Sequence, residues 1–91
     1  MKISGAQVKA ARDLLRITQQ ELAKVSGVSE RTIAGFEADE NVPKPSSIAK
    51  ITGELERRGI EFTNGSGMGV RLNFDKAEAF ARQHLAAPTD P

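Results

Sequence analysis

Few side chains in this 91-residue chain have the type and spacing that catalysis or metal binding requires. The chain contains no cysteine, which excludes thiolate zinc sites, iron–sulfur clusters, disulfides and cysteine nucleophiles. The single histidine, His84, has no partner in the sequence, and we interpret it as a surface side chain. Glu54, Glu56 and Glu61 lie close in sequence, but no nucleophile or metal-ligand set accompanies them. These observations predict that the protein is not an enzyme and has no metal or other cofactor.

A glycine-rich segment, residues 65–69, could suggest a phosphate-binding loop. The dinucleotide-binding fingerprint needs a strand before the glycines and a helix directly after them. Here the pattern that follows is that of a strand, so we interpret the segment as a hairpin loop. The chain also lacks tryptophan and tyrosine, the side chains that most often stack on bases. This leaves little support for recognition of single-stranded nucleic acid.

Size and composition are those of one small globular domain with at most a short appendage. The mass is 9.8 kDa, with 38% hydrophobic and 27% charged residues. No apolar run approaches the length of about 18 residues that a membrane-spanning helix needs. The first four residues lack the apolar core of a secretory signal. We therefore expect a cytoplasmic protein with no membrane partner.

Charge is distributed unevenly along the chain. The formal net charge is only +1, but residues 1–36 hold six basic and three acidic side chains, a net charge of +3. Residues 37–91 hold seven basic and nine acidic side chains, a net charge of −2. A basic N-terminal half could bind a polyanion. The alternative is chance variation on a solvated surface.

Helix start and stop signals divide the first two-thirds of the chain. Ser4 is a predicted N-cap, and Thr18 with Glu21 forms a predicted capping box. Ser29 is the next N-cap, and the segment around Pro43 and Pro45 must be extended. Ser46 or Ser47 is expected to cap a fourth helix, which Gly59 closes. The predicted helices cover residues 4–15, 18–27, 29–38 and 46–59.

The remaining residues change from helical to alternating patterns. Residues 60–63 and 70–74 alternate with period two, which predicts a β-hairpin. Asp75, with Glu78 three residues later, is expected to start a last helix that ends at Leu85. The tail, residues 86–91, has two prolines and should fray. The apolar side chains predicted on one face of the hairpin are Ile60, Phe62, Val70, Leu72 and Phe74.

The segment from residue 19 to residue 38 has the residues that two short helices need to pack near a right angle. Ala23 is small enough for a close crossing, and Gly27 permits the left-handed backbone that ends the first of the two helices. Leu22, Ile33 and Phe36 supply apolar contacts between them. The alternative is a helical hairpin within an unrelated bundle.

This segment, TQQELAKVSGVSERTIAGFE at residues 18–37, resembles the lambda-repressor-like (Cro/cI-type, Xre) helix-turn-helix family. The resemblance covers Ser4 to about Gly59. It implies a mainly α protein whose four-helix domain places its third helix in the DNA major groove, usually as a dimer that regulates transcription. Family members also pair an arginine of the first helix with the glutamate that closes the third. Those positions are Arg12 and Glu37 here, and the pair is expected to be structural.

The resemblance also implies which residues contact DNA. Gln19 corresponds to a glutamine that meets a phosphate at a helix N-terminus, and Lys44 is expected to touch the DNA backbone. Two departures from the family pattern are Gly35, where many relatives have a long base-reading side chain, and Ser26, where most have an apolar one.

The start of the third helix is the expected base-reading segment. Arg31 can donate two hydrogen bonds to guanine O6 and N7, and Glu30 can accept from cytosine N4. Thr32 is expected to reach a phosphate or a thymine methyl group, and Ser29 lies beside these residues at the exposed helix start.

The sequence therefore predicts three parts: a helix-turn-helix DNA-binding domain (1–59), a hairpin plus helix that forms a homodimer (60–85), and a flexible tail (86–91). The dimer is expected because the hairpin's apolar face needs a cover. That cover is either Ile51 and Leu55 of the fourth helix or a second copy, and residues 4–59 offer no other obvious apolar surface. The expected function is that of a sequence-specific double-stranded DNA-binding repressor of a palindromic operator. The alternatives are an antitoxin-like regulator that also binds a protein toxin, and a protein-interaction module.

Overall fold

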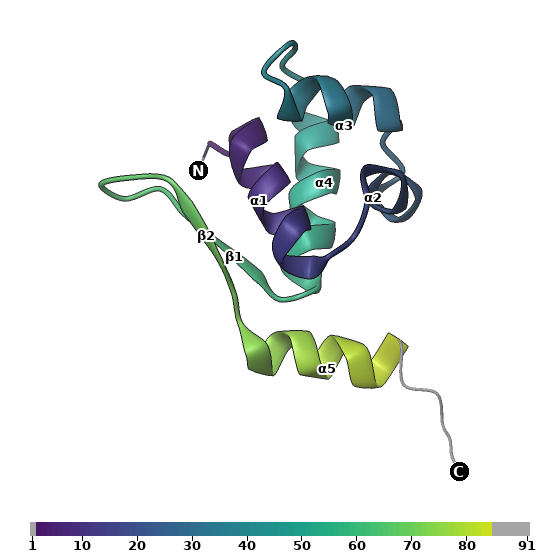
Figure 1. The fold of residues 1–91 in the computed structure, drawn as a ribbon, viewed down its shortest axis with the longest axis vertical. Helices are drawn as coiled ribbons and strands as arrows, with labels where there is room; N and C mark the ends of the chain where they lie inside the picture. The colour runs from purple at the N-terminus through teal and green to yellow at the C-terminus, as the bar shows by residue number, and fades with distance from the viewer. Residues whose placement is uncertain (1, 85–91) are drawn as a thin grey trace.

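The computed structural model describes residues 2–84 and has a helical bundle, a β-hairpin across one side of it, and a further helix (Figure 1). This mainly helical architecture confirms the predicted fold class. Leu85 and residues 86–91, including the predicted frayed tail, lie outside the described residues. The elements are α1 (Gly5–Leu15), α2 (Gln19–Ser26), α3 (Glu30–Glu37), α4 (Pro45–Arg57), β1 (Ile60–Thr63), β2 (Gly69–Leu72) and α5 (Phe74–His84).

Capping boxes begin the first two helices, as the sequence predicts. At α1 the backbone N–H of Gln7 donates to Ser4 Oγ at 3.2 Å, and Ser4 N–H donates back to Gln7 Oε1 at 2.9 Å. At α2 the backbone N–H of Glu21 donates to Thr18 Oγ1 at 3.0 Å, and Thr18 N–H donates to Glu21 Oε1 at 2.7 Å. Each box satisfies two backbone donors that the helix itself leaves unpaired.

The start of α4 differs from the prediction. Lys44, not Ser46 or Ser47, occupies the N-cap position, and no side chain caps the helix. Pro45 is the first helical residue, where its fixed φ suits the helix and its missing N–H costs nothing. Because a residue before proline is forced into extended conformation, Lys44 has φ −64° and ψ 155°. The proline therefore sets this boundary two or three residues earlier than the serines suggest.

One hydrophobic core joins the helical bundle to the hairpin. Ile51 and Leu55 of α4 are fully buried in the same cluster as Val8, Leu22 and Ile33. Ile60 and Phe62 of β1 belong to that cluster too, and Val70 and Leu72 of β2 pack against it. The chain's own helices therefore cover the apolar face of the hairpin, which is the first of the two covers expected from the sequence.

A buried amide fastens the hairpin to α1. Gln7 Nε2 donates to Asn64 Oδ1 at 2.7 Å, to the carbonyl oxygen of Gly69 at 3.1 Å and to that of Thr63 at 3.3 Å. Gln7 as a whole is only 3% exposed, so these bonds satisfy a polar group that is removed from water. The hairpin is thereby held along α1 as part of the domain.

The end of β2 and the start of α5 also differ from the prediction. The antiparallel ladder pairs Ile60 with Leu72 and ends there, and Phe74 is the first residue of α5, 80% exposed. Asn73 rather than Asp75 caps this helix, because its Oδ1 accepts the backbone N–H of Lys76 at 3.0 Å. The cap ends the alternating pattern before Phe74, so Phe74 does not share the apolar face of the hairpin.

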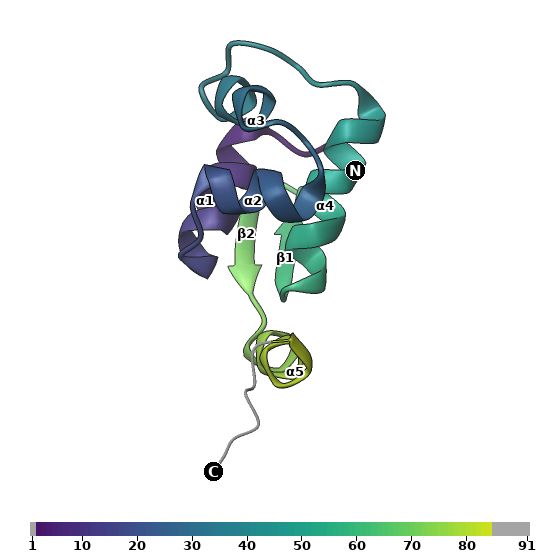
Figure 2. The ribbon, with the colours of Figure 1, turned by 90° about the vertical axis from the view of Figure 1, so that its right-hand side faces the viewer.

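Helix α5 lies beyond the end of α4, on the opposite side of the molecule from α3 (Figures 1 and 2). Its Phe80 is buried, with the guanidinium carbon of Arg58 at 4.7 Å from the ring centre. His84 is exposed, as predicted. It stacks on Phe80 with ring centres 4.3 Å apart, and its Nε2 lies 3.1 Å from Arg57 Nη1, contacts that the sequence did not indicate. Within the described residues, no helix has the length and apolar character needed to cross a membrane.

Candidate nucleic-acid interface

The α2–turn–α3 unit is built as its sequence predicts. Gly27 ends α2 with φ +78°, and its backbone N–H donates to the carbonyl of Ala23. A Cβ at Gly27 would meet nothing within 4 Å, so the backbone conformation, and not space, favours glycine there. Leu22 and Ile33 are fully buried between the helices, which leaves the start of α3 on the surface.

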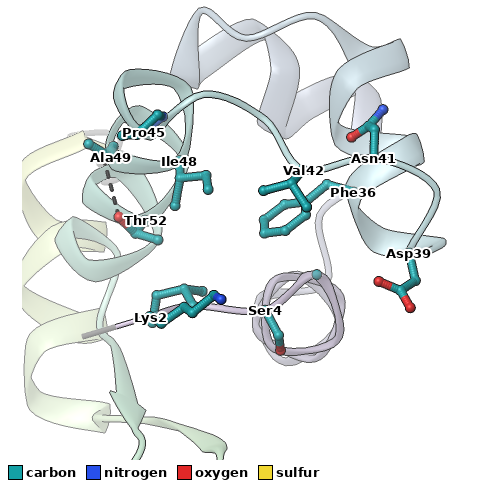
Figure 3. A pocket seen from close by; sticks show the side chains of 12 residues that line it. Lys2, Ser4, Phe36, Asp39, Asn41, Val42, Pro45, Ile48, Ala49 and Thr52 are labelled. Carbon is teal, nitrogen blue, oxygen red and sulfur yellow. Dashed lines mark hydrogen bonds between the residues drawn. The ribbon is translucent and has the colours of Figure 1, made fainter.

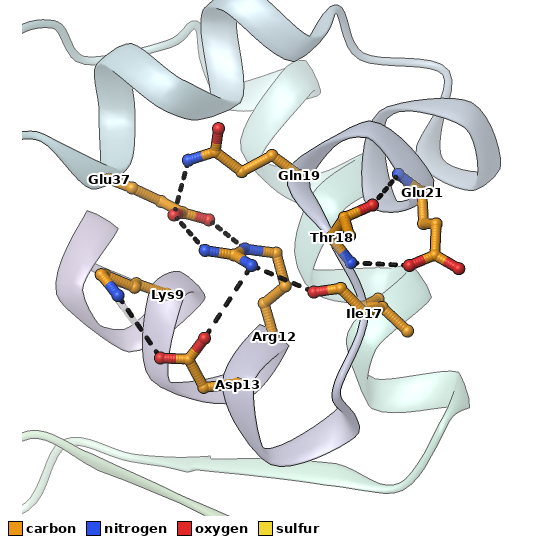
Figure 4. A network of polar contacts seen from close by, with 8 residues as sticks. All are labelled: Lys9, Arg12, Asp13, Ile17, Thr18, Gln19, Glu21 and Glu37. Atoms are coloured by element: carbon orange, nitrogen blue, oxygen red, sulfur yellow. Dashed lines mark hydrogen bonds and ion pairs between the residues drawn. The ribbon is translucent and has the colours of Figure 1, made fainter.

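An ion pair ties α3 to α1 (Figure 4). Arg12 donates from Nε to Glu37 Oε2 at 3.0 Å and from Nη2 to Glu37 Oε1 at 2.9 Å, and a third bond runs from Nη1 to the Ile17 carbonyl at 3.0 Å. The side chains of Arg12 and Glu37 are 13% and 3% exposed, respectively. The hydrogen bond to Glu37 raises the pKa of Arg12 above its usual value. The expected structural pair is therefore present.

Gln19 completes this network. Its Nε2 donates to Glu37 Oε1 at 2.9 Å, so the side chain points toward the ion pair. The side-chain contact with phosphate expected from the family is therefore not its resting arrangement. Its backbone N–H has no partner within residues 2–84 and lies at the N-terminus of α2. An anion binds favourably at such a position.

The first turn of α3 divides the predicted base-reading residues into two kinds. Ser29 Oγ accepts the backbone N–H of Thr32 at 3.1 Å and donates to Thr32 Oγ1 at 2.9 Å, so these two hydroxyls serve the helix cap. Glu30 and Arg31 are exposed and form no ion pair within the described residues. The side chains free to contact a ligand are therefore those of Glu30 and Arg31.

The family's usual base-reading position at Gly35 is covered by the loop after α3. The backbone N–H of Glu40 donates to the Gly35 carbonyl at 2.8 Å, and a Cβ at Gly35 would lie 2.3 Å from Asn41 Nδ2. Asn41 itself is exposed. An asparagine can bond both N6 and N7 of adenine, which makes Asn41 a candidate that the sequence reasoning missed. Only the fold-back of the loop reveals it.

Comparison with known proteins agrees with this geometry. A family profile described as Helix-turn-helix matches residues 8–60, more than half of the chain. The chain belongs to the lambda-repressor-like helix-turn-helix family. Its members are DNA-binding regulators, and the match supports this role for the chain. No curated protein matches the sequence.

Among the described residues, the free positive charges of this helix-turn-helix protein lie in the half of the chain before residue 51, which extends past the basic segment 1–36. In the described part, every lysine and arginine after residue 50 is in an ion pair: Arg57, Arg58, Arg71, Lys76 and Arg82. Six basic side chains before residue 51 have no ion-pair partner among residues 2–84: Lys2, Arg16, Lys24, Arg31, Lys44 and Lys50. Exposed Lys44 and Arg31 are both in this set, which favours contact between this half and a polyanion.

An open cleft lies beside the C-terminal end of α3 (Figure 3). It has a volume of about 780 Å³, and side chains from the segment before α1, the α3–α4 loop and α4 line it. Phe36, Val42 and Ile48 form apolar walls, with Lys2 and Asp39 among the polar lining residues. This cleft corrects the expectation that residues 4–59 offer no further apolar surface. No group of three or more potential metal ligands occurs in the described residues.

Proposed function

We propose that the protein is a sequence-specific double-stranded DNA-binding repressor that binds a palindromic operator as a homodimer through residues 60–85. The observation that carries this proposal is the first turn of α3. Glu30 and Arg31 are exposed there and have no ion-pair partner among residues 2–84, while the other end of the helix is fixed. The Arg12–Glu37 pair holds the pose of α3, so that base-reading side chains need little reorganisation on binding.

The base contacts follow from the chemistry of the exposed side chains. Arg31 donates two hydrogen bonds to guanine O6 and N7, and Glu30 accepts from cytosine N4. Asn41 lies above Gly35 and offers an amide to an adjacent base. Ser29 Oγ is engaged in the helix cap, whereas the Thr32 hydroxyl accepts from it and keeps its own hydrogen, which can be donated to a phosphate.

Phosphate contacts position the helix and carry no sequence information. The backbone N–H of Gln19, at the start of α2, and the ammonium of exposed Lys44, at the start of α4, supply them. A dimer presents two such units to major-groove half-sites about 34–36 Å apart, which explains why the operator would be palindromic.

Selection of duplexes from a random-sequence DNA pool tests this function, because the selection itself identifies the operator. We expect enrichment of an inverted repeat whose half-sites contain a guanine read by Arg31. The same selection with Arg31→Ala should lose preference at that base pair. Lys9→Ala, which removes an exposed basic side chain of α1 that is already paired with Asp13, is the matched control and should select the same repeat. Failure of the native chain to enrich any sequence would contradict the proposal.

A further inference from the structure

The cleft beside the C-terminal end of α3 has no part in the DNA contacts proposed above, and it has the size of a small-molecule site. Its volume is about 780 Å³, within the range of about 300–1,000 Å³ that is usual for ligand pockets. Figure 3 shows Phe36 and Val42 on one side of the hollow and Ile48 on the other. Val42 is 80% exposed, so this wall offers a branched apolar side chain that nothing in residues 2–84 covers.

One free cation lies beside these apolar walls. Lys2 lines the cleft, is exposed, and has no ion-pair partner among residues 2–84. In the view of Figure 3 its ammonium nitrogen lies below the gap between Ile48 and Val42, whereas the carboxylate of Asp39 lies on the far side of Phe36. The charge nearest to the open apolar space is therefore positive.

The hydroxyl groups of the lining are already engaged within their own helices. Ser4 Oγ accepts the backbone N–H of Gln7 at 3.2 Å, and Thr52 Oγ1 donates to the Ala49 carbonyl at 3.3 Å. This leaves the ammonium of Lys2 as the group that complements a charged ligand at the apolar walls. A single cation suits a carboxylate, which carries one negative charge, better than a phosphate monoester, which carries nearly two.

The loop that forms one wall also carries two of the residues expected to contact DNA. Val42 lies between Asn41, which covers Gly35, and Lys44, which is the N-cap residue of α4. The loop is attached to α3 by the hydrogen bond from Glu40 N–H to the Gly35 carbonyl, at 2.8 Å. A ligand packed against Val42 therefore touches the segment that positions Asn41 and Lys44.

We propose that the cleft binds a small monocarboxylate with an aromatic or branched apolar body, and that the bound ligand weakens operator binding. The apolar body packs between Val42 and Ile48, and the carboxylate pairs with Lys2. The direction of the effect follows from charge, because the bound anion neutralises a free cation and adds a negative charge beside the loop that carries Lys44. The effect on DNA rests on the proposed function, whereas binding of the ligand does not.

An NMR titration of the ¹⁵N-labelled full chain with naphthylacetate, without DNA, tests the site. We expect saturable shifts at the backbone amides of Val42 and Ile48. Val42→Asp places a second carboxylate in the wall and should weaken binding about tenfold or more. Val25→Asp is the matched control, because Val25 is 42% exposed on α2 and does not line the cleft, and it should leave binding unchanged. Shifts confined to other parts of the chain, or equal binding by Val42→Asp, would overturn the inference.

The sign of the ligand's charge is tested with naphthylmethylamine, which has the same ring system and a positive charge. The native chain should bind it about two- to fivefold more weakly than naphthylacetate, as expected for one exposed ion pair. Lys2→Gln should remove this difference. A preference for the amine, or a preference for the carboxylate that persists in Lys2→Gln, would overturn the assignment of Lys2.

The effect on DNA is tested with the operator that the selection identifies. Saturating naphthylacetate should lower operator affinity about fivefold or more, and operator DNA should lower naphthylacetate affinity by the same factor, because coupling between two sites is reciprocal. Operator binding by Val42→Asp should not respond to naphthylacetate. Operator affinity that is unchanged or raised in the native chain would overturn the regulatory role. If naphthylacetate binds in the cleft but the native chain enriches no DNA sequence, the proposed function fails and the ligand site stands.

Discussion

Glu37 is the residue on which the pose of the recognition helix depends. Its carboxylate accepts two bonds from Arg12 and one from Gln19, and its side chain is nearly inaccessible. A pair of this kind need not add stability over an apolar pair, because both charges lose their hydration. Loss of one partner is different, since it leaves the other charge buried without compensation.

We therefore expect Glu37→Ala to lower the free energy of unfolding by about 3 kcal/mol, the low end for a broken buried pair because Arg12 retains some exposure. Urea denaturation measures this change. Glu30→Ala removes an exposed carboxylate from the same helix and should change stability by about 0.5 kcal/mol or less. Equal effects of the two substitutions would show that the Arg12–Glu37 pair does not hold α3 in place.

Glu61, on the hairpin, is a second carboxylate that accepts several hydrogen bonds from charged and polar side chains. Hydrogen bonds from Arg71, then Lys76 and Asn73, lower its pKa to about 2. Because the pKa in the folded state is below the usual value, the stabilising contribution of Glu61 is present above about pH 4.5. It is lost as the pH falls through about 2.

Thermal unfolding at pH 5 and at pH 2.5 tests this dependence. The melting temperature of the native chain should fall more between these pH values than that of Glu61→Gln, which cannot lose the carboxylate. Glu78→Gln, a change at an exposed i,i+4 pair with Arg82, serves as the control and should behave like the native chain. If Glu61→Gln shows the same acid sensitivity as the native chain, the contribution assigned to Glu61 is wrong.

Among the helices and strands, the sequence predicts those ends that are determined by hydrogen bonds between residues close in the chain. Ser4, Thr18 and Gly27 mark helix ends because their bonds reach only three or four residues along the chain. The start of α4 was missed because Pro45 and the serines after it gave competing signals, and the end of β2 because Asn73 interrupts an alternating pattern.

The candidate site was predictable to a lesser extent. Arg31 and Glu30 follow from their place at a helix start, whereas the Arg12–Glu37 pair spans 25 residues and was expected only from the family resemblance. The cover of Gly35 by Asn41 depends on how a loop folds back, which no short-range pattern encodes.

The predicted domain boundary at residue 59 can be tested by the stability of shortened chains. Because Ile60 and Phe62 are part of the shared core, a chain ending at Gly59 loses both of these core side chains, each worth about 1.5–3 kcal/mol. We therefore expect this truncated chain to have a clearly lower urea midpoint than the full chain. A chain ending at Asn73 keeps the hairpin and should be intermediate. If the shortest chain were as stable as the full chain, the hairpin would be an independent appendage.

For the whole molecule, the uneven charge predicts how DNA binding responds to salt. Each phosphate contact contributes roughly −0.9 to the slope of log K against log salt concentration. Lys44→Gln should reduce the magnitude of this slope by about one unit and weaken binding equally for all sequences. Lys9→Gln, which removes a basic side chain already paired with Asp13, should leave the slope unchanged. Binding of the native chain that does not vary with salt would contradict this assignment.

If the first turn of α3 reads DNA sequence, the ratio of affinities for the selected operator and for random duplex must depend on Arg31. Arg31→Ala should lower operator affinity by about 1–3 kcal/mol per half-site while leaving random-duplex affinity nearly unchanged, so the ratio collapses. An equal loss of affinity for both duplexes would make Arg31 a phosphate contact and would contradict the account.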